Sequence, residues 1–126
     1  MLQNPHIPPN AFSKICPSRD VLARLGQKWT ILAMVALRDK PLRFVEIRRR
    51  IQGVSDRMLT QTLRAMERDG LVQRKVYDER LPRVEYTLSV LARSALPILV
   101  ELKKWAECSL ESIEASMQRF DSNIDL

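Results

Sequence analysis

The residues best suited to chemistry lie in one segment, 55–69, where basic and amide side chains recur at helical spacing. At about 100° per residue, Leu59, Leu63 and Met66 share one side of the expected helix. The opposite arc carries three guanidinium groups, a hydroxyl and an amide, from Arg57, Thr60, Gln61, Arg64 and Arg68. Arginine can bond guanine bidentately, glutamine can bond adenine, and threonine can reach a base or a phosphate. This arc predicts contact with the major groove of DNA, against the simpler interpretation of a solvated helix face.

Cys16 is a second candidate for chemistry because it lies just ahead of Ser18, which can cap a helix. The positive end of a helix dipole, with Lys14 and Arg19 close in sequence, favours the thiolate form. The sharper hypothesis is a sensor of oxidants or electrophiles, and the simpler one is a small buried residue. These residues alone favour the simpler one. They assign no function to Cys108.

The formal charge is +6, and the basic charge is concentrated in the first three quarters of the 126 residues, a length typical of one domain. Residues 38–93 carry fourteen Lys and Arg against eight acidic residues, whereas residues 94–126 carry three against six. A basic block favours polyanions through phosphate neutralisation and counterion release. Two cysteines make no disulfide framework, and no apolar run approaches the roughly 20 residues of a membrane helix. We therefore expect a cytoplasmic protein with no membrane partner.

The sequence contains few residues in an arrangement that could catalyse a reaction. The single histidine is His6, near the N-terminus, and neither a metal-spaced Cys/His cluster nor a phosphate-cradling glycine loop is present. We therefore expect no catalytic residues, no metal and no cofactor. The alternative function is a protein–protein interaction module with a basic face. The mixture of Arg, Thr and Gln favours DNA, because a module that needs only charge has no use for base-reading groups.

Two helices joined by a tight turn should position the 55–69 segment. Phe44, Ile47 and Ile51 form one apolar stripe of the first helix, which a turn at residues 52–54 ends. Ser55 is then a good N-cap for the second helix. This layout is a helix-turn-helix.

The remaining central segments indicate a buried helix and a hairpin. Residues 29–37 are apolar on nearly all sides, as in the buried centre of a small domain. Gly70 supplies a left-handed C′ position for the helix before it. Strands are expected at 71–77 and 83–88, with a further very short one at 42–43.

The hairpin and its charged loop at residues 78–82 make a wing. Arg80 at the tip, with Lys75 and Arg83 on the adjoining strands, could reach the minor groove or flanking phosphates. An ordinary charged turn is an equal alternative, because Asp78 and Glu79 lie beside Arg80.

The last segment, 90–120, should form a long helix that begins after Ser89 and kinks at Pro97. Its apolar seam consists of Leu99, Leu102, Ala106, Leu110, Ile113, Met117 and Phe120. A chain this short has no opposing partner for such a seam, which predicts a two-fold dimer. Alternatively the seam folds back onto its own domain, as we expect near residues 96–99.

An ordered set of motifs between residues 14 and 107 resembles the HxlR-type transcriptional regulators, a winged helix-turn-helix group related to the MarR regulators. The motifs are Cys16-Pro17, GQKWT at 26–30, RFVEI at 43–47, SDRMLTQTL at 55–63, DGLV at 69–72 and PRVEYTL at 82–88. The resemblance implies a homodimer on palindromic operator DNA, held together by its N- and C-terminal helices. It places the recognition helix after Ser55 and the wing at 77–82. Several members respond to oxidants through the cysteine matching Cys16, which gives the sensor hypothesis equal weight.

The predicted fold is mainly α with a small β-hairpin wing, an α+β winged helix-turn-helix. Residues 1–15 form an arm, 16–120 the domain with its dimerisation helix at 90–120, and 121–126 a tail. The predicted function is a sequence-specific, homodimeric transcription regulator whose partners are double-stranded DNA and a second copy; the residues name no small-molecule effector. The predicted DNA contacts are Arg43, Ser55, Arg57, Thr60, Gln61, Arg64, Arg68, Lys75, Arg80 and Arg83.

Overall fold

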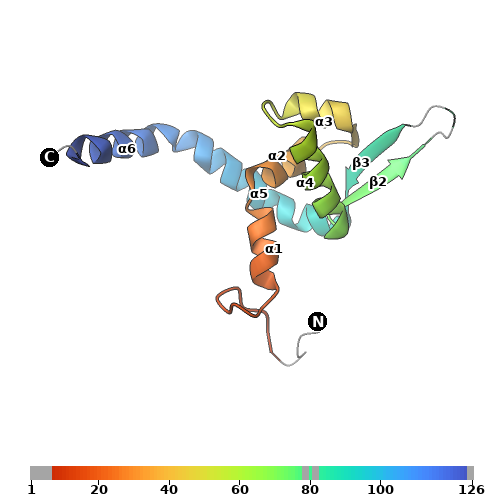
Figure 1. Cartoon of the computed structure of the whole chain (residues 1–126), viewed down its shortest axis with the longest axis horizontal. Helices are drawn as coiled ribbons and strands as arrows, with labels where there is room; N and C mark the ends of the chain where they lie inside the picture. The colour runs from red at the N-terminus through yellow and green to blue at the C-terminus, as the bar shows by residue number, and fades with distance from the viewer. Residues whose placement is uncertain (1–6, 78–79, 81–82, 125–126) are drawn as a thin grey trace.

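The computed structural model describes residues 7–77, 80 and 83–124, and over these residues it contains six helices and a three-stranded sheet (Figure 1). In chain order the elements are α1 (Ser18–Leu25), α2 (Lys28–Ala36), β1 (Leu42–Arg43), α3 (Phe44–Arg50), α4 (Asp56–Arg68), β2 (Val72–Val76), β3 (Val84–Leu88), α5 (Val90–Cys108) and α6 (Leu110–Ile124). This is a winged helix-turn-helix, so the predicted fold class is confirmed. Parts of the predicted arm, wing loop and tail lie outside the described residues.

The core is built around α2, the helix that the sequence predicts to be buried. Ala33, Met34 and Leu37 are fully inaccessible, because apolar side chains cover this helix on nearly every side. Neighbouring helices add further fully buried side chains, among them Ile47 from α3 and Leu63 from α4. Each large side chain buried in this way stabilises the fold by roughly 1.5–3 kcal/mol. The core therefore holds α3 and α4 rigidly against α2.

The sheet is antiparallel, with strand order β1-β3-β2. Val72 pairs with Leu88 at the base of the β2–β3 hairpin, and both side chains are buried. Val76, at the far end of β2, pairs with Val84 and is half exposed. The hairpin is thus anchored to the core at its base and projects away from the helices, as a wing does (Figure 1).

Three of the predicted helix ends have the expected chemistry. The Ser55 hydroxyl accepts the backbone N–H of Met58 at 3.0 Å, and the Ser89 hydroxyl accepts that of Ala92 at 3.1 Å. Gly70 has φ +78°, the left-handed conformation that favours glycine after a helix.

The expected cap at Ser18 is wrong. Pro17 occupies the N-cap position of α1, and no side chain among the described residues caps this helix. The Ser18 hydroxyl instead lies 3.0 Å from the Cys16 sulfur.

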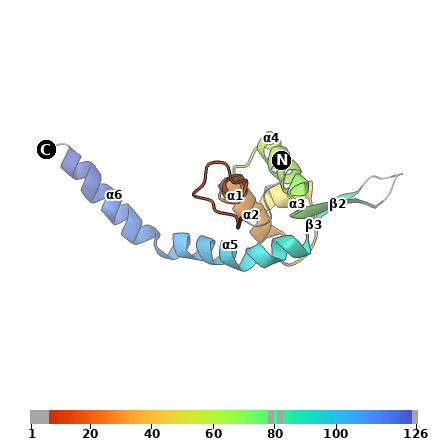
Figure 2. The same cartoon turned by 90° about the horizontal axis from the view of Figure 1, so that it is seen from below.

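The C-terminal segment forms two helices rather than one continuous helix over 90–120. The break falls at Ser109, and the chain changes direction there (Figure 2). Pro97 lies within α5 without ending it, because Leu96 and Leu99 on either side are buried and hold that segment on the core. Serine favours helix ends over helix interiors, which suits Ser109 to the break. Helix α6 continues to Ile124, into the segment predicted as a tail.

Over the part of the chain that the structure describes, no helix is long and apolar enough to cross a membrane.

Candidate nucleic-acid interface

Helix α4 is amphipathic in the way that the sequence predicts. Leu59, Leu63 and Met66 are at most 1% exposed and face the core. The predicted base-reading side chains are all exposed: Arg57, Thr60, Gln61, Arg64 and Arg68. The apolar side thus fixes the helix, and the polar arc is accessible to a ligand as large as a duplex.

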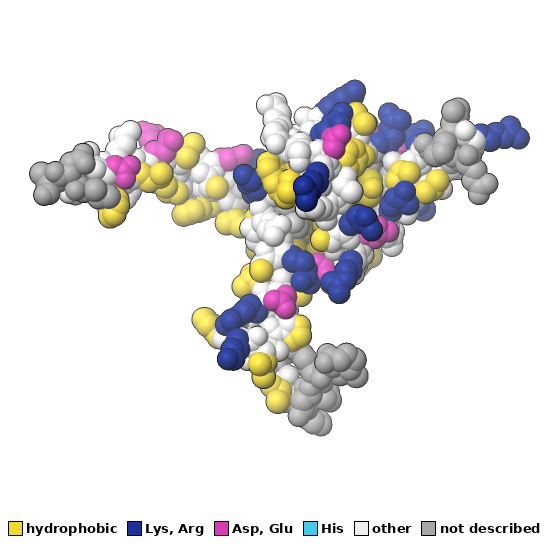
Figure 3. Space-filling view, in the orientation of Figure 1, with side chains coloured by type: hydrophobic (Ala, Val, Ile, Leu, Met, Phe, Trp, Pro, Cys, Tyr) yellow, Lys and Arg dark blue, Asp and Glu magenta, His cyan; other side chains and the backbone are white. Residues whose placement is uncertain are grey.

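The basic groups of this arc are not neutralised within the described part of the protein. Among the residues that the structure describes, Arg57, Arg64 and Arg68 form no ion pair. Lys and Arg side chains gather over α3, α4 and the wing, whereas acidic and apolar side chains alternate along the C-terminal helices (Figure 3). The exposed arc therefore lies within a positive surface of the kind that attracts phosphate groups.

The turn between α3 and α4 is fixed by an ion pair as well as by packing. The Arg48 guanidinium on α3 donates to the Asp56 carboxylate at the start of α4 at 2.8 Å. At the other end of α3, the Arg43 N–H donates to the Glu46 carboxylate at 2.8 Å. This hydrogen bond lowers the pKa of Glu46, with a smaller contribution from the positive charge of Arg43. The Arg48–Asp56 pair positions the first turn of α4 relative to α3, whereas the Arg43–Glu46 contact fixes the start of α3.

The three wing cations that the sequence predicts as DNA contacts, Lys75, Arg80 and Arg83, are all exposed. The Arg83 guanidinium lies 3.0 Å from the Glu85 carboxylate, and the Lys75 ammonium lies over the Tyr77 ring at 5.8 Å. Arg80 is the one wing-tip residue between 78 and 82 that the structure describes. With Arg43 and Ser55, which are also exposed, all ten predicted DNA contacts are accessible to solvent.

An ion pair that the sequence does not indicate connects α1 with α4. The Arg24 guanidinium donates to both carboxylate oxygens of Asp69, at 2.6 and 2.9 Å. Asp69 is the C-cap of α4, so the end of the N-terminal helix is attached to the end of the helix with the basic arc. The two residues are 45 positions apart, and no local pattern signals such a pair. Asp69 raises the pKa of Arg24 through this hydrogen bond, against a lowering by desolvation.

Sequence reasoning also overlooked Arg74 and Trp105. Arg74 is exposed on β2, between Gln73 and Lys75, and the three consecutive polar residues were the available signal. Trp105 is 60% exposed on α5 and lies three residues after Leu102, a spacing that would have placed it on the apolar seam.

Cys16 is half buried ahead of α1, and two polar groups contact its sulfur. The Asn10 N–H donates to the Cys16 sulfur at 3.3 Å, and the Ser18 hydroxyl lies 3.0 Å from it. Neither Cys16 nor the exposed Cys108 is in a disulfide. The Cys16 sulfur therefore lies in a polar environment that can stabilise a negative charge.

Most of the predicted C-terminal seam is exposed in one protomer. The exposed members are Leu102, Ala106, Leu110, Ile113, Met117 and Phe120. Leu99 is the exception, because it is 7% exposed and belongs to the core of its own domain. Phe12, Ile15 and Leu22, in and just before α1, are also exposed. We name the six exposed members of the seam the C-terminal apolar face.

A helix-turn-helix with an exposed basic second helix and a projecting hairpin defines the winged-helix class of DNA-binding proteins. The model of the HxlR-like helix-turn-helix family matches residues 24–114, and the chain belongs to this family. The resemblance stated from the motifs is therefore confirmed. Proteins of this family are helix-turn-helix transcriptional regulators rather than enzymes, and the chain is a DNA-binding regulator of that type.

Similar proteins include both a curated relative and solved structures. The uncharacterized HTH-type transcriptional regulator YtfH of Escherichia coli (strain K12) is 41% identical over 106 residues, which cover 84% of each chain. The structure of the putative transcriptional regulator ytfH from Salmonella typhimurium has a TM-score of 0.82 and 39% identity, covering 88% of this chain and 99% of that one. The redox regulator HypR in its reduced form has a TM-score of 0.71 and 36% identity, covering 79% and 98%.

Proposed function

We propose that the chain is a homodimer that binds a palindromic operator, with α4 in the major groove and the wing beside it. The observation that carries this proposal is the exposed, unneutralised arc of Arg57, Gln61 and Arg64 on α4. Arginine and glutamine side chains at the surface of a groove-entering helix can read base edges. Arg43, Arg80 and Arg83 would contact the sugar-phosphate backbone, which positions the helix.

A second copy would be recruited through the C-terminal apolar face together with the apolar side chains around α1. An apolar face of this length is unusual on a monomer, and two-fold pairing covers it with an identical face. Two copies of α4 would then meet half-sites about 34 Å apart, or a multiple of this distance. This spacing is the reason to expect a palindromic operator.

The test is a binding titration at physiological salt against the DNA that flanks the gene of this protein, with random DNA of equal length beside it. Arg57→Ala and Arg64→Ala should each weaken specific binding by about 1–3 kcal/mol and change binding to random DNA much less. Arg119→Ala, which removes the same charge from α6, is the matched control and should bind as the wild type does. Equal losses on both DNAs would contradict base reading and leave only a charged surface. A chain that binds neither DNA would favour a protein–protein interaction module.

We further propose that Cys16 makes operator binding responsive to oxidants. The similarity to HypR, a redox regulator, supports this role, as do the polar contacts of the Cys16 sulfur with Asn10 and Ser18. A peroxide would take two electrons from the thiolate and leave a sulfenic acid, with the other peroxide oxygen departing as hydroxide or water. The larger, more polar group would disturb the contacts ahead of α1.

The test compares operator affinity with and without hydrogen peroxide. The wild type should change its affinity, Cys16→Ser should not, and Cys108→Ser should respond as the wild type does. A response that survives in Cys16→Ser would remove this residue from the mechanism.

A further inference from the structure

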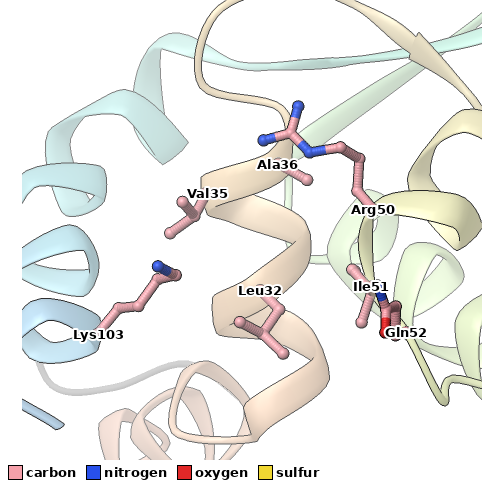
Figure 4. A pocket seen from close by; sticks show the side chains of 7 residues that line it. All are labelled: Leu32, Val35, Ala36, Arg50, Ile51, Gln52 and Lys103. Carbon is pink, nitrogen blue, oxygen red and sulfur yellow. The ribbon is translucent and has the colours of Figure 1, made fainter. Parts of the chain in front are cut away.

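A cavity of about 150 Å³ lies where α2, the turn after α3 and α5 meet. Its floor is apolar and includes Leu32, Val35 and Ile51, whereas Arg50, Gln52 and Lys103 supply polar groups around it. Lys103 reaches toward α2 from α5, and Arg50 reaches toward it from the end of α3 on the opposite side (Figure 4). We name this space the α2–α5 cavity.

The charged side chains that line the α2–α5 cavity all carry positive charge. Of the residues that the structure describes, two cations line it and no acidic residue does. Within the described part of the chain Arg50 forms no ion pair, and Lys103 pairs only with Glu107, at 2.7 Å. Glu107 lines a neighbouring cavity, which shares Leu32 and Lys103 with the first. A guanidinium that is not neutralised by a carboxylate, beside an apolar floor, is suited to a ligand that brings its own carboxylate.

The size of the cavity limits the apolar part of such a ligand. A protein cavity of about 150 Å³ lined by apolar side chains is large enough to hold benzene. Binding sites combine apolar walls with a few polar groups that fix the orientation of the ligand. The α2–α5 cavity has both features, on the scale of one six-membered ring or a short branched chain.

We propose that the α2–α5 cavity binds a small organic monocarboxylate, with its apolar body on Leu32, Val35 and Ile51 and its carboxylate paired with Arg50 and Lys103. Ile51 and Gln52 belong to the turn that leads into α4, so such a ligand contacts the helix-turn-helix and α5 together. Binding of this ligand requires no DNA, and it stands or falls separately from operator recognition.

The experiment is a nuclear magnetic resonance titration of the ¹⁵N-labelled full chain with benzoate. Benzoate should give saturable shifts, largest at the amides of Ile51, Gln52 and Lys103. Benzamide keeps the ring without the charge, and acetate keeps the charge without the ring. Each should bind at least about tenfold more weakly, because each lacks either a charge-assisted interaction or the apolar surface.

Variants at Arg50 and Lys103, which lie outside the buried core, test the two cations. Arg50→Ala and Lys103→Met should weaken benzoate binding about tenfold or more. Arg49→Ala and Lys104→Met remove the same charges from neighbouring positions outside the cavity lining and should leave the affinity unchanged. Glu107→Gln should strengthen binding, because it releases Lys103 from its 2.7 Å ion pair and removes a repelling charge.

Three results would overturn the proposal. The first is the absence of saturable shifts with benzoate. The second is equal binding of benzoate and either control compound, which would indicate a purely apolar or a purely charged surface. The third is equal affinity in Arg50→Ala, Arg49→Ala and the wild type.

Discussion

At the scale of single residues, the proposed interface contains side chains that contact bases and side chains that contact phosphates. Arg57, Gln61 and Arg64 project from a helix whose opposite side is buried, so they can be held against base edges. Arg80 is exposed at the hairpin tip, where a cation can neutralise phosphate, which positions a protein on DNA without reading its sequence. The two groups should therefore respond differently to salt and to sequence.

Replacing Arg80 by alanine should weaken binding to operator and random DNA alike. The plot of log affinity against log salt should become flatter by about 0.9 for each phosphate that is no longer neutralised, and so by about two per dimer. Affinity measured by fluorescence anisotropy between about 50 and 200 mM salt gives this slope. Lys104→Ala, on α5, is the control. A slope identical to that of the wild type would show that Arg80 does not contact phosphate.

The local sequence pattern was sufficient to predict the residues of the α4 arc. Helical periodicity places Leu59 and Leu63 on one side of the helix and Arg57 and Arg64 on the other. The pattern could not predict the bond between Arg24 and Asp69, because two charged residues 45 positions apart carry no sign of their partner. The sequence did predict that the seam folds back onto its own domain near residues 96–99, and Leu99 does lie in that core.

At the scale of elements, the ends of α4 determine how its polar arc is presented. Ser55 caps its first turn, Arg48 on α3 holds Asp56, and Arg24 on α1 holds Asp69. The cap at Ser55 and the glycine after Asp69 are short-range signals that the sequence displays. The break at Ser109 was not predicted, because proline at 97 is the stronger local signal and only packing of the flanking leucines keeps that turn helical.

Two substitutions of Ser55 distinguish its effect on the stability of α4 from its effect on DNA affinity. Ser55→Ala removes the 3.0 Å hydrogen bond from the Met58 N–H and should lower the free energy of unfolding by about 0.5–2 kcal/mol. Ser55→Asp keeps a capping oxygen and adds a charge that suits a helix N-terminus, so it should unfold close to the wild type. The same negative charge should repel phosphate and weaken DNA binding. Urea denaturation and DNA titration measure the two effects.

Ser89→Ala is the matched control for this pair. It removes the 3.1 Å bond from the Ala92 N–H at the start of α5, and also the 2.6 Å bond that the Ser89 hydroxyl donates to the Gly70 carbonyl after α4. It should lower stability and leave DNA affinity unchanged at temperatures where the chain stays folded. Wild-type DNA affinity in Ser55→Asp would exclude the start of α4 from the DNA interface.

At the scale of the whole molecule, charge and apolar surface are separated. The basic side chains lie over α3, α4 and the wing, and the C-terminal apolar face lies on α5 and α6 (Figure 3). This separation allows one surface to bind DNA while the other binds a second copy. The uneven charge along the sequence already indicates it, whereas the direction in which α6 leaves the domain could come only from the structure (Figure 2).

A double variant, Met117→Glu with Phe120→Glu, should abolish the dimer. These side chains are 57% and 65% exposed in one protomer, and two buried carboxylates without partners oppose association. The wild type should sediment with twice the mass of one chain, and the double variant with the mass of one chain and an unchanged helical spectrum. Gln118→Glu places one such charge beside them on α6 and should remain dimeric. A wild type that sediments as a monomer at micromolar concentration would contradict the two-fold assembly.

The most direct measurement of base reading by α4 replaces single guanines of the operator with 7-deazaguanine, which removes the N7 acceptor from the major groove. For at least one guanine in each half-site, the replacement should weaken binding of the wild type and have no further effect on Arg57→Ala or Arg64→Ala. If the wild type binds every substituted operator as tightly as the natural one, the arginine side chains of α4 do not read guanine in the major groove.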